Sequence, residues 1–185
     1  LAPQIKDSSK LIRVAPGIDT DHFSPCDATS LRQRHGLDNR PTIISVGRLV
    51  HRKGQDRLIE ALPKVLESIP DAALVLVGEG PYRKHLTDLV EKYNLSDHVF
   101  FIGRIHFAEL PSYICMGDVF AMPSRSRLFG LEVEGLGIVY LEASSCGLPV
   151  IGGSSGGAPD AVLDGETGYV VDGNDLTGIS TQIIR

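Results

Sequence analysis

The sequence predicts an α/β domain, a Rossmann-like parallel sheet with helices on both faces. Short apolar runs, rich in β-branched residues, alternate along the chain with segments in which apolar residues recur at helical spacing. The short runs are apolar throughout, which is typical of strands that helices cover on both sides. Such an alternation favours a parallel sheet over an antiparallel one.

Six runs are interpreted as strands, at 42–46, 73–77, 99–102, 119–122, 150–151 and 169–171. Helices are expected between them, from Leu58 to Ile69, from Leu86 to Tyr93, from Phe107 to Ile114, and over 136–146. Pro63 falls inside the first helical segment, so this helix is expected to start late or to kink. Ligands of parallel sheets bind at the carboxyl ends of the strands, and we expect a site in the loops there.

Length and composition fit one globular domain with a hydrophobic core. The 185 residues are 42% hydrophobic and 22% charged, and no apolar run reaches the length of a membrane-spanning helix. The net charge of −5 argues against a nucleic-acid-binding protein, because such proteins are normally basic. Cys26, Cys115 and Cys146 lack the spacing of a metal site or a disulfide framework, and we expect buried free thiols in a reducing cytoplasm.

Residues 1–20 fit the alternating pattern least, and we interpret them as an interdomain linker or edge segment. Residues 21–185 are then expected to form the α/β domain. The chain begins at Leu1 rather than at Met, and it ends inside a segment that is typical of the start of a helix. We therefore expect it to be a fragment of a longer protein.

Two glutamates mark the stretch that points most directly to a ligand site. Glu142 is the one charged residue between Glu134 and Asp160, and it lies in a helix that is otherwise apolar or small. An unpaired buried carboxylate is costly, so we expect Glu142 to meet a cation or ligand hydroxyl groups. Gly135 and Gly137 leave the start of this helix open to an anion or a sugar. The alternative is a core helix whose glutamate caps neighbouring backbone.

Basic residues follow the first expected strand, in the loop 47–54. Arg48, Arg52 and Lys53 place positive charge where a phosphate group would sit. A solvated basic loop is the alternative, although the position at the carboxyl end of a strand favours a function. A second loop, 152–159, is rich in glycine and serine and is interpreted as an anion cradle, with a plain flexible turn as its alternative.

Other chemistries receive less support. We find no arrangement of a nucleophile, a histidine and an acid, and no cluster of metal ligands. The loop 152–159 matches neither a P-loop nor the Gly-x-Gly-x-x-Gly pattern after a first strand, which counts against an ATPase and a dehydrogenase. Two carboxylates would suit a glycosidase, but a hydrolase does not need the basic loop.

The ordered set of short motifs resembles a known family. The motifs are Gly47-Arg48 with Lys53-Gly54, the segments 77–81 and 101–104, Pro123-Ser124, Glu134 and Glu142 with seven residues between them, and Gly156-Gly157. Together they resemble the C-terminal domain of glycosyltransferase family 4, which is the C-terminal half of a two-domain GT-B fold. The segment 131–143 is similar to the actinobacterial phosphatidylinositol mannosyltransferases that use GDP-mannose, in part because Leu136 stands where many relatives have phenylalanine.

The resemblance implies roles for individual residues. By position, the donor-binding residues would be Gly47, Arg48, Lys53, Gly103, Arg104, Glu134, Gly135, Leu136, Gly137, Ile138 and Glu142. Arg48, Lys53 and Glu134 would be catalytic: the two cations steady the leaving nucleoside diphosphate, and the glutamate contacts sugar hydroxyls. Glu142 would hold the ribose, and the loop at Gly103-Arg104 would bracket the base through its backbone.

The resemblance also implies the activity of the full-length protein. It would transfer mannose, with retention, from GDP-mannose to a lipid of the phosphatidylinositol mannoside type, with no metal and no other cofactor. It would be cytoplasmic and peripheral at the inner face of the plasma membrane, where its glycolipid acceptor lies, and it would have no nucleic-acid partner. The acceptor-binding N-terminal domain is missing from this chain, so we expect the fragment alone to be inactive.

Three alternatives stay open at this stage. The chain could be a family 4 domain that uses a UDP-sugar, or a module that binds a nucleotide sugar without chemistry. A nucleotide-sugar epimerase or dehydrogenase is the third, and it ranks low because the chain lacks both the glycine-rich first turn and a Tyr-x-x-x-Lys pair.

Overall fold

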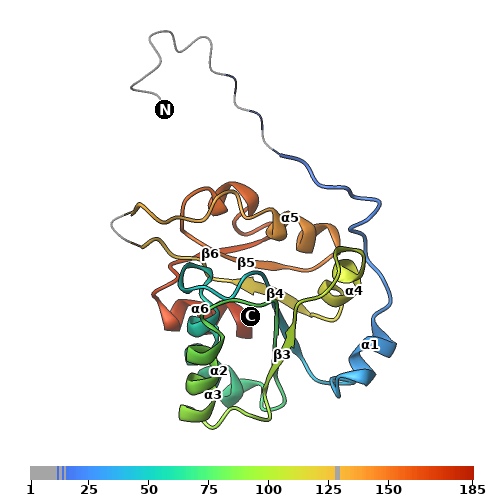
Figure 1. Cartoon of the computed structure of the whole chain (residues 1–185), viewed down its shortest axis with the longest axis vertical. Helices are drawn as coiled ribbons and strands as arrows, with labels where there is room; N and C mark the ends of the chain where they lie inside the picture. The colour runs from blue at the N-terminus through green and yellow to red at the C-terminus, as the bar shows by residue number, and fades with distance from the viewer. Residues whose placement is uncertain (1–11, 13, 15, 128–129) are drawn as a thin grey trace.

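A six-stranded parallel sheet forms the centre of the molecule (Figure 1). The computed structural model describes residues 12, 14, 16–127 and 130–185. The strand order is β3-β2-β1-β4-β5-β6, and every neighbouring pair is parallel, as the sequence predicts. The strands are β1 (Thr42–Val46), β2 (Ala73–Val77), β3 (Val99–Gly103), β4 (Val119–Met122), β5 (Val150–Gly153) and β6 (Gly168–Val171).

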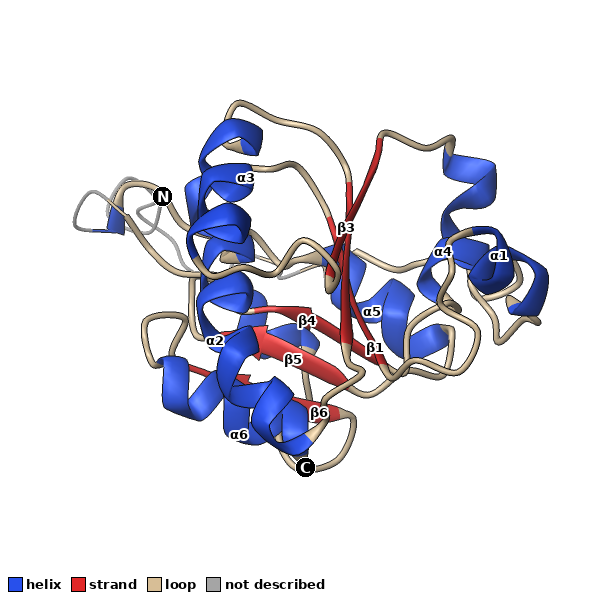
Figure 2. Ribbon diagram, turned by 90° about the horizontal axis from the view of Figure 1, so that it is seen from below, coloured by secondary structure: helices blue, strands red, loops and turns tan. Residues whose placement is uncertain are grey.

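Helices cover both faces of the sheet (Figure 2). The α-helices are α1 (Thr29–Arg34), α2 (Gln55–Ser68), α3 (Arg83–Lys92), α4 (Leu110–Ile114), α5 (Ile138–Ser145) and α6 (Leu176–Ile184). Three 3₁₀ turns complete the described part of the chain: η3 (His51–Lys53), η4 (Phe107–Glu109) and η6 (Ala158–Ala161). Helices α2, α3 and α6 lie on one face, and α1, α4 and α5 lie on the other. None of the helices in this described part is both long and apolar enough to traverse a bilayer.

Two hydrophobic cores form because the strands alternate their side chains between the faces. On β2, Val75 and Val77 belong to the core that contains Tyr140 of α5, whereas Leu74 and Leu76 belong to the core that contains α2. All five β2 residues are buried, which explains the continuous apolar run in the sequence. Burying an aliphatic side chain contributes about 1.5–3 kcal/mol, so the two layers together hold the sheet in place.

Two helix starts differ from the sequence-based expectation. Helix α2 begins at Gln55 and continues through Pro63, so the predicted late start is wrong. Its apolar face, which includes Leu58 and Leu62, is buried in one core, and this packing outweighs the hydrogen bond that proline cannot donate. Helix α5 begins at Ile138 rather than at residue 136, because Gly137 adopts a left-handed backbone with a φ of 70°.

The predicted linker lies largely outside the described residues. Within 1–20, Ile12 and Val14 are exposed, whereas Phe23, just after this segment, is buried in the core. The cysteines are free, but only Cys146 is buried, so the expectation of three buried thiols is wrong. Burial raises the pKa of the Cys146 thiol to about 11.

The hydroxyl of Tyr140 supports the first prediction. Tyr140 is fully buried, and its hydroxyl lies 2.7 Å from the carbonyl oxygen of Met122 and 3.1 Å from Ser124 Oγ. Burial raises the pKa of this phenol to about 12, so it stays a neutral donor. Tyr140→Phe removes one of two donors to the Met122 carbonyl, which still accepts from the Ser124 N–H, and it removes the contact with Ser124 Oγ. We expect the free energy of unfolding in urea to fall by about 0.5–1.5 kcal/mol.

A control variant is Tyr113→Phe. The hydroxyl of this half-buried residue makes no hydrogen bond with the described part of the chain. An equal loss of stability in the two variants would contradict the role given to Tyr140.

Candidate functional site

The carboxyl ends of three neighbouring strands are joined by backbone hydrogen bonds at glycines. The Gly47 N–H, after β1, donates to the Val77 carbonyl at 2.9 Å. The Gly78 N–H, after β2, donates to the Gly103 carbonyl of β3 at 2.8 Å. The loops that carry three of the sequence motifs therefore leave the same edge of the sheet side by side.

The basic loop after β1 packs on the loop that follows β4. It turns through η3 and enters α2 at Gly54, whose φ of 76° is left-handed. A Cβ at Gly54 would lie 2.2 Å from the carbonyl oxygen of Pro123, so only glycine allows this contact. The Arg125 N–H also donates to the Arg52 carbonyl at 2.9 Å. The two loops are thus joined by their backbones.

A buried ion pair spans these loops. Lys53 Nζ lies 2.9 Å from Glu134 Oε1, and the side chains are only 12% and 7% exposed. Arg52 Nε lies 3.7 Å from the other carboxylate oxygen, Oε2. Within the described part of the chain that oxygen is buried and accepts no hydrogen bond. A carboxylate withdrawn from water needs cations beside it, and the basic loop supplies them.

The glycine- and serine-rich loop after β5, which the sequence suggests as an anion cradle, supports Glu134 and uses several of its N–H groups within the chain. Ser155 Oγ accepts a hydrogen bond from the Glu134 N–H at 3.1 Å. The Gly157 N–H donates to the Gly135 carbonyl at 2.8 Å, and the N–H groups of Ser154, Ala158 and Asp160 also bond to carbonyls of the chain. These donors are therefore engaged in holding the segment that presents the glutamate.

Glu142 extends from α5 and is half-buried. Burial raises the pKa of its carboxyl group above the ordinary value, and the nearby His22 ring acts weakly in the opposite direction. The expectation of a glutamate that is partly shielded from water is confirmed. No hydrogen bond from the described residues reaches this carboxylate.

One cavity of about 510 Å³ joins these groups. It is lined by Pro16, Val46, Gly47, Lys53, Glu134, Leu136, Gly137, Ile138, Val139 and Glu142. Seven of the residues predicted from the sequence are in this set. Arg48, Arg104 and Gly135 are exposed and lie outside it. Gly103 lines a neighbouring cavity of about 460 Å³, together with Glu79, Arg83 and Phe101.

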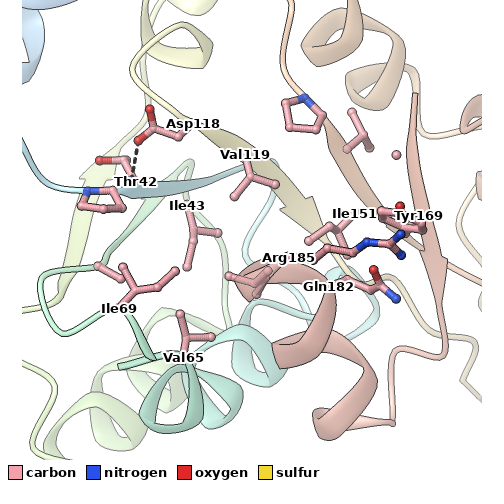
Figure 3. Close-up of a pocket in the computed structure, with 16 residues that line it drawn as sticks. Thr42, Ile43, Val65, Ile69, Asp118, Val119, Ile151, Tyr169, Gln182 and Arg185 are labelled. Atoms are coloured by element: carbon pink, nitrogen blue, oxygen red, sulfur yellow. Dashed lines mark hydrogen bonds between the residues drawn. The ribbon is translucent and has the colours of Figure 1, made fainter. Parts of the chain in front are cut away.

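Another cavity, of about 490 Å³, lies at the opposite edge of the sheet (Figure 3). Its walls come from the beginnings of β1, β4, β5 and β6 and from α2 and α6, and they are mostly apolar. The Thr42 N–H donates to Asp118 Oδ2 at 2.7 Å on its rim. None of the predicted site residues lines it.

Sequence reasoning missed several residues that build the site. From the sequence, Ser155 is only one residue of the glycine- and serine-rich loop, and Pro16 lies in the predicted linker yet lines the cavity. Asp56 and Arg125 form a buried ion pair behind the two loops. Neither residue carries a sequence signal, because they are far apart in the chain and each has the appearance of an ordinary surface charge. Among the described residues, no group of three or more His, Cys, Asp or Glu could hold a metal ion.

Fold and site define a class: a parallel α/β domain with a charged, ligand-sized cavity at the carboxyl edge of its sheet, as in the glycosyltransferases of the GT-B fold. Residues 27–185 match the family described as glycosyl transferases group 1, and the chain belongs to that family.

Sequence relatives narrow the comparison. The chain is 52% identical to the GDP-mannose-dependent alpha-(1-6)-phosphatidylinositol monomannoside mannosyltransferase of Mycolicibacterium smegmatis, an alignment that covers 95% of this chain and 47% of that protein. The chain therefore spans about half the length of the curated relatives it matches.

Solved structures agree on the fold. The crystal structure of Anabaena HepE in complex with UDP-glucose has a TM-score of 0.79 at 28% identity and covers 90% of this chain and 45% of that chain. The C-terminal domain of a glycosyl transferase group 1 family protein from Francisella tularensis has a TM-score of 0.74 at 28% identity, with 90% and 86% covered.

The raised pKa of Glu142 makes a prediction about stability. A carboxyl group whose pKa is higher in the folded than in the unfolded state binds more protons when folded, so its ionisation destabilises the fold as the pH rises through that window. Glu142→Gln removes the charge. We expect the variant to melt at a higher temperature than the wild type at pH 7.5, with the difference shrinking at pH 4.

Glu91→Gln, at an exposed position on α3, is the matched control and should change little. If Glu142→Gln melts at or below the wild-type temperature at pH 7.5, burial of the charged Glu142 carboxylate does not destabilise the fold.

Proposed function

We propose that this domain binds GDP-mannose as the donor half of a retaining α-mannosyltransferase. The observation that carries the proposal is Glu134: a nearly buried carboxylate faces the cavity with one oxygen held by Lys53 and the other without a hydrogen bond. Such an oxygen costs free energy until a donor reaches it, and a sugar hydroxyl is a donor of the right kind.

The diphosphate would lie between the basic loop and the start of α5. Lys53 lines the cavity, and Arg48 is exposed at its edge of the sheet, free to turn toward a bound anion. Backbone N–H groups at the start of α5, next to Gly137, add the favourable end of a helix dipole. Because Lys53 also holds Glu134, the phosphate and the sugar-binding carboxylate share one cation.

Glu142 is proposed to hold the ribose. It lies on α5 and lines the same cavity as Glu134, and its carboxylate has no hydrogen bond from the described residues. Two ribose hydroxyls would offset the burial that raises its pKa. The base would extend toward Gly103 and Arg104, where the neighbouring cavity opens.

The chemistry asked of these groups is stabilisation of the departing diphosphate. Fixed cations and helix N–H groups supply this without reorganisation at the moment of bond breaking. Arg48 and Lys53 are therefore the proposed catalytic cations, and Glu134 positions the sugar. No metal is needed in this scheme.

Guanine and mannose are favoured over other donors by sequence similarity. The Mycolicibacterium smegmatis relative, at 52% identity, is named for GDP-mannose, whereas HepE, bound to UDP-glucose, is 28% identical. A UDP-sugar donor is the second candidate, because HepE shares the fold.

The acceptor is proposed to be a phosphatidylinositol mannoside, as in the name of the same relative. Its binding would require a further domain and a peripheral position at the inner face of the membrane. The alternative function, a module that binds the donor without catalysing transfer, differs from this proposal because it would need no acceptor-binding domain.

Calorimetric titration tests donor binding. We expect the chain to bind GDP more tightly than UDP or ADP, and Lys53→Ala to weaken GDP binding on the order of 10–100-fold, because a charge-assisted contact contributes about 1.5–3 kcal/mol. Glu142→Gln should weaken GDP and GDP-mannose alike, while Glu134→Gln should weaken GDP-mannose more than GDP.

Lys64→Ala is the control, because Lys64 is an exposed residue of α2 that pairs with Glu67. Equal affinity for GDP and UDP would overturn the choice of base. Unchanged binding in Lys53→Ala and Glu142→Gln would overturn the site.

A mannose-transfer assay tests whether this domain is active without a further, acceptor-binding domain. With radiolabelled GDP-mannose and phosphatidylinositol monomannoside, we expect the 185-residue chain to form no labelled lipid, while the Mycolicibacterium smegmatis enzyme serves as positive control. Transfer above background by the chain alone would show that the acceptor side does not need a further domain.

A further inference from the structure

Asp56 and Arg125 form a buried ion pair between the two loops of the candidate site. The Arg125 guanidinium donates to both carboxylate oxygens, at 2.9 Å and 2.6 Å, and the residues are 3% and 5% exposed. The Tyr82 hydroxyl lies 3.4 Å from Asp56 Oδ2. Neither charged side chain lines the cavity of about 510 Å³.

A buried ion pair of this kind contributes little net stability to a fold. Removing two charges from water costs about as much as their attraction returns, and apolar replacements of similar volume are often as stable. A two-pronged guanidinium–carboxylate contact does, however, fix distance and orientation between the elements that carry it. The useful question is therefore which elements this pair aligns.

The pair joins the two loops of the candidate site. Asp56 lies in the first turn of α2, directly after the loop that carries Lys53, and Arg125 lies in the loop that leads from β4 to Glu134. Between them the Arg125 N–H bonds to the Arg52 carbonyl. Asp56–Arg125 is thus the buried end of a contact whose cavity end is Lys53–Glu134.

We propose that Asp56 and Arg125 are positioning residues that set the spacing between Lys53 and Glu134, and thereby the recognition of the sugar on the diphosphate. The inference rests on the proposed function. A flexible lysine still reaches a phosphate when the loops shift, but a buried carboxylate contacts a sugar hydroxyl only at a defined place. Loss of the pair should therefore reduce binding of the sugar more than binding of the nucleoside diphosphate.

The test compares two dissociation constants in each variant, for GDP and for GDP-mannose. Their ratio measures what the mannosyl group contributes. We expect Arg125→Lys, which keeps the charge and loses the fork, to shrink that ratio at least fivefold. The double variant Asp56→Leu with Arg125→Met should melt at or near the wild-type temperature, because it removes both charges, and still show the reduced ratio.

Arg32→Lys is the matched control. Arg32 is a largely buried arginine of α1 that donates to the carbonyls of Met116, Leu37 and Arg40, away from the cavity. The Arg32→Lys variant should melt at a lower temperature than the wild type and have an unchanged ratio of the GDP and GDP-mannose dissociation constants. A wild-type ratio in both Arg125→Lys and the double variant, with the fold retained, would overturn the proposal.

Amide hydrogen exchange tests, without any nucleotide, whether Asp56 and Arg125 hold the two loops in place. The Arg125 and Glu134 N–H groups bond to Arg52 and Ser155, respectively. We expect both amides to exchange at least tenfold faster in Arg125→Lys and in the double variant, and at the wild-type rate in Arg32→Lys. Unchanged exchange would overturn the proposal, whereas failure of the wild type to bind either nucleotide would instead overturn the proposed function.

Discussion

The carboxylate of Glu134 is withdrawn from water, and the surrounding structure is arranged to keep it charged and in place. Lys53 and Arg52 come to it from the loop after β1, and Ser155 accepts a hydrogen bond from its N–H. A buried charge of this kind is tolerated only where partners are fixed beforehand. The contact between Gly54 and Pro123 and the pairing of Asp56 with Arg125 provide that fixation. Lys53 and Glu134, the two residues of this buried pair, also line the cavity.

Local sequence patterns predict most of the sheet and part of the site. The β2 run is apolar because both of its faces are buried, and that is visible without coordinates. Lys53 can also be predicted because it follows a strand, and Glu134 because glycines and a second glutamate, Glu142, follow it. Asp56 and Arg125 cannot be predicted in this way, because pairing between distant charges leaves no periodic trace. The role of Ser155 has no sequence signal for a related reason: composition does not show that its Oγ accepts a hydrogen bond from the distant Glu134 N–H. Tertiary packing likewise overrides the local effect of Pro63.

The two edges of the sheet have different characters. At the carboxyl edge, the charged side chains of Lys53, Glu134 and Glu142 line a cavity, whereas the cavity at the amino edge is mainly apolar. Volume does not separate them, because they are nearly equal in size. The buried ion pair of Lys53 and Glu134, which lines the cavity at the carboxyl edge, does separate them. The assignment of the site therefore depends on its chemistry.

The strand order has a consequence for how the molecule assembles. Strands β1, β2 and β3 pair with neighbours that are close in sequence, but β1 also pairs with β4, and Ile43 lies opposite Val119. Closing such a long loop is slow, because entropy is lost before the contact forms. The two halves of the cavity lie on either side of this seam, so they meet only after it closes. A ligand that contacts both halves would therefore bind only the chain in which β1 and β4 are paired. Its binding would stabilise that pairing against opening.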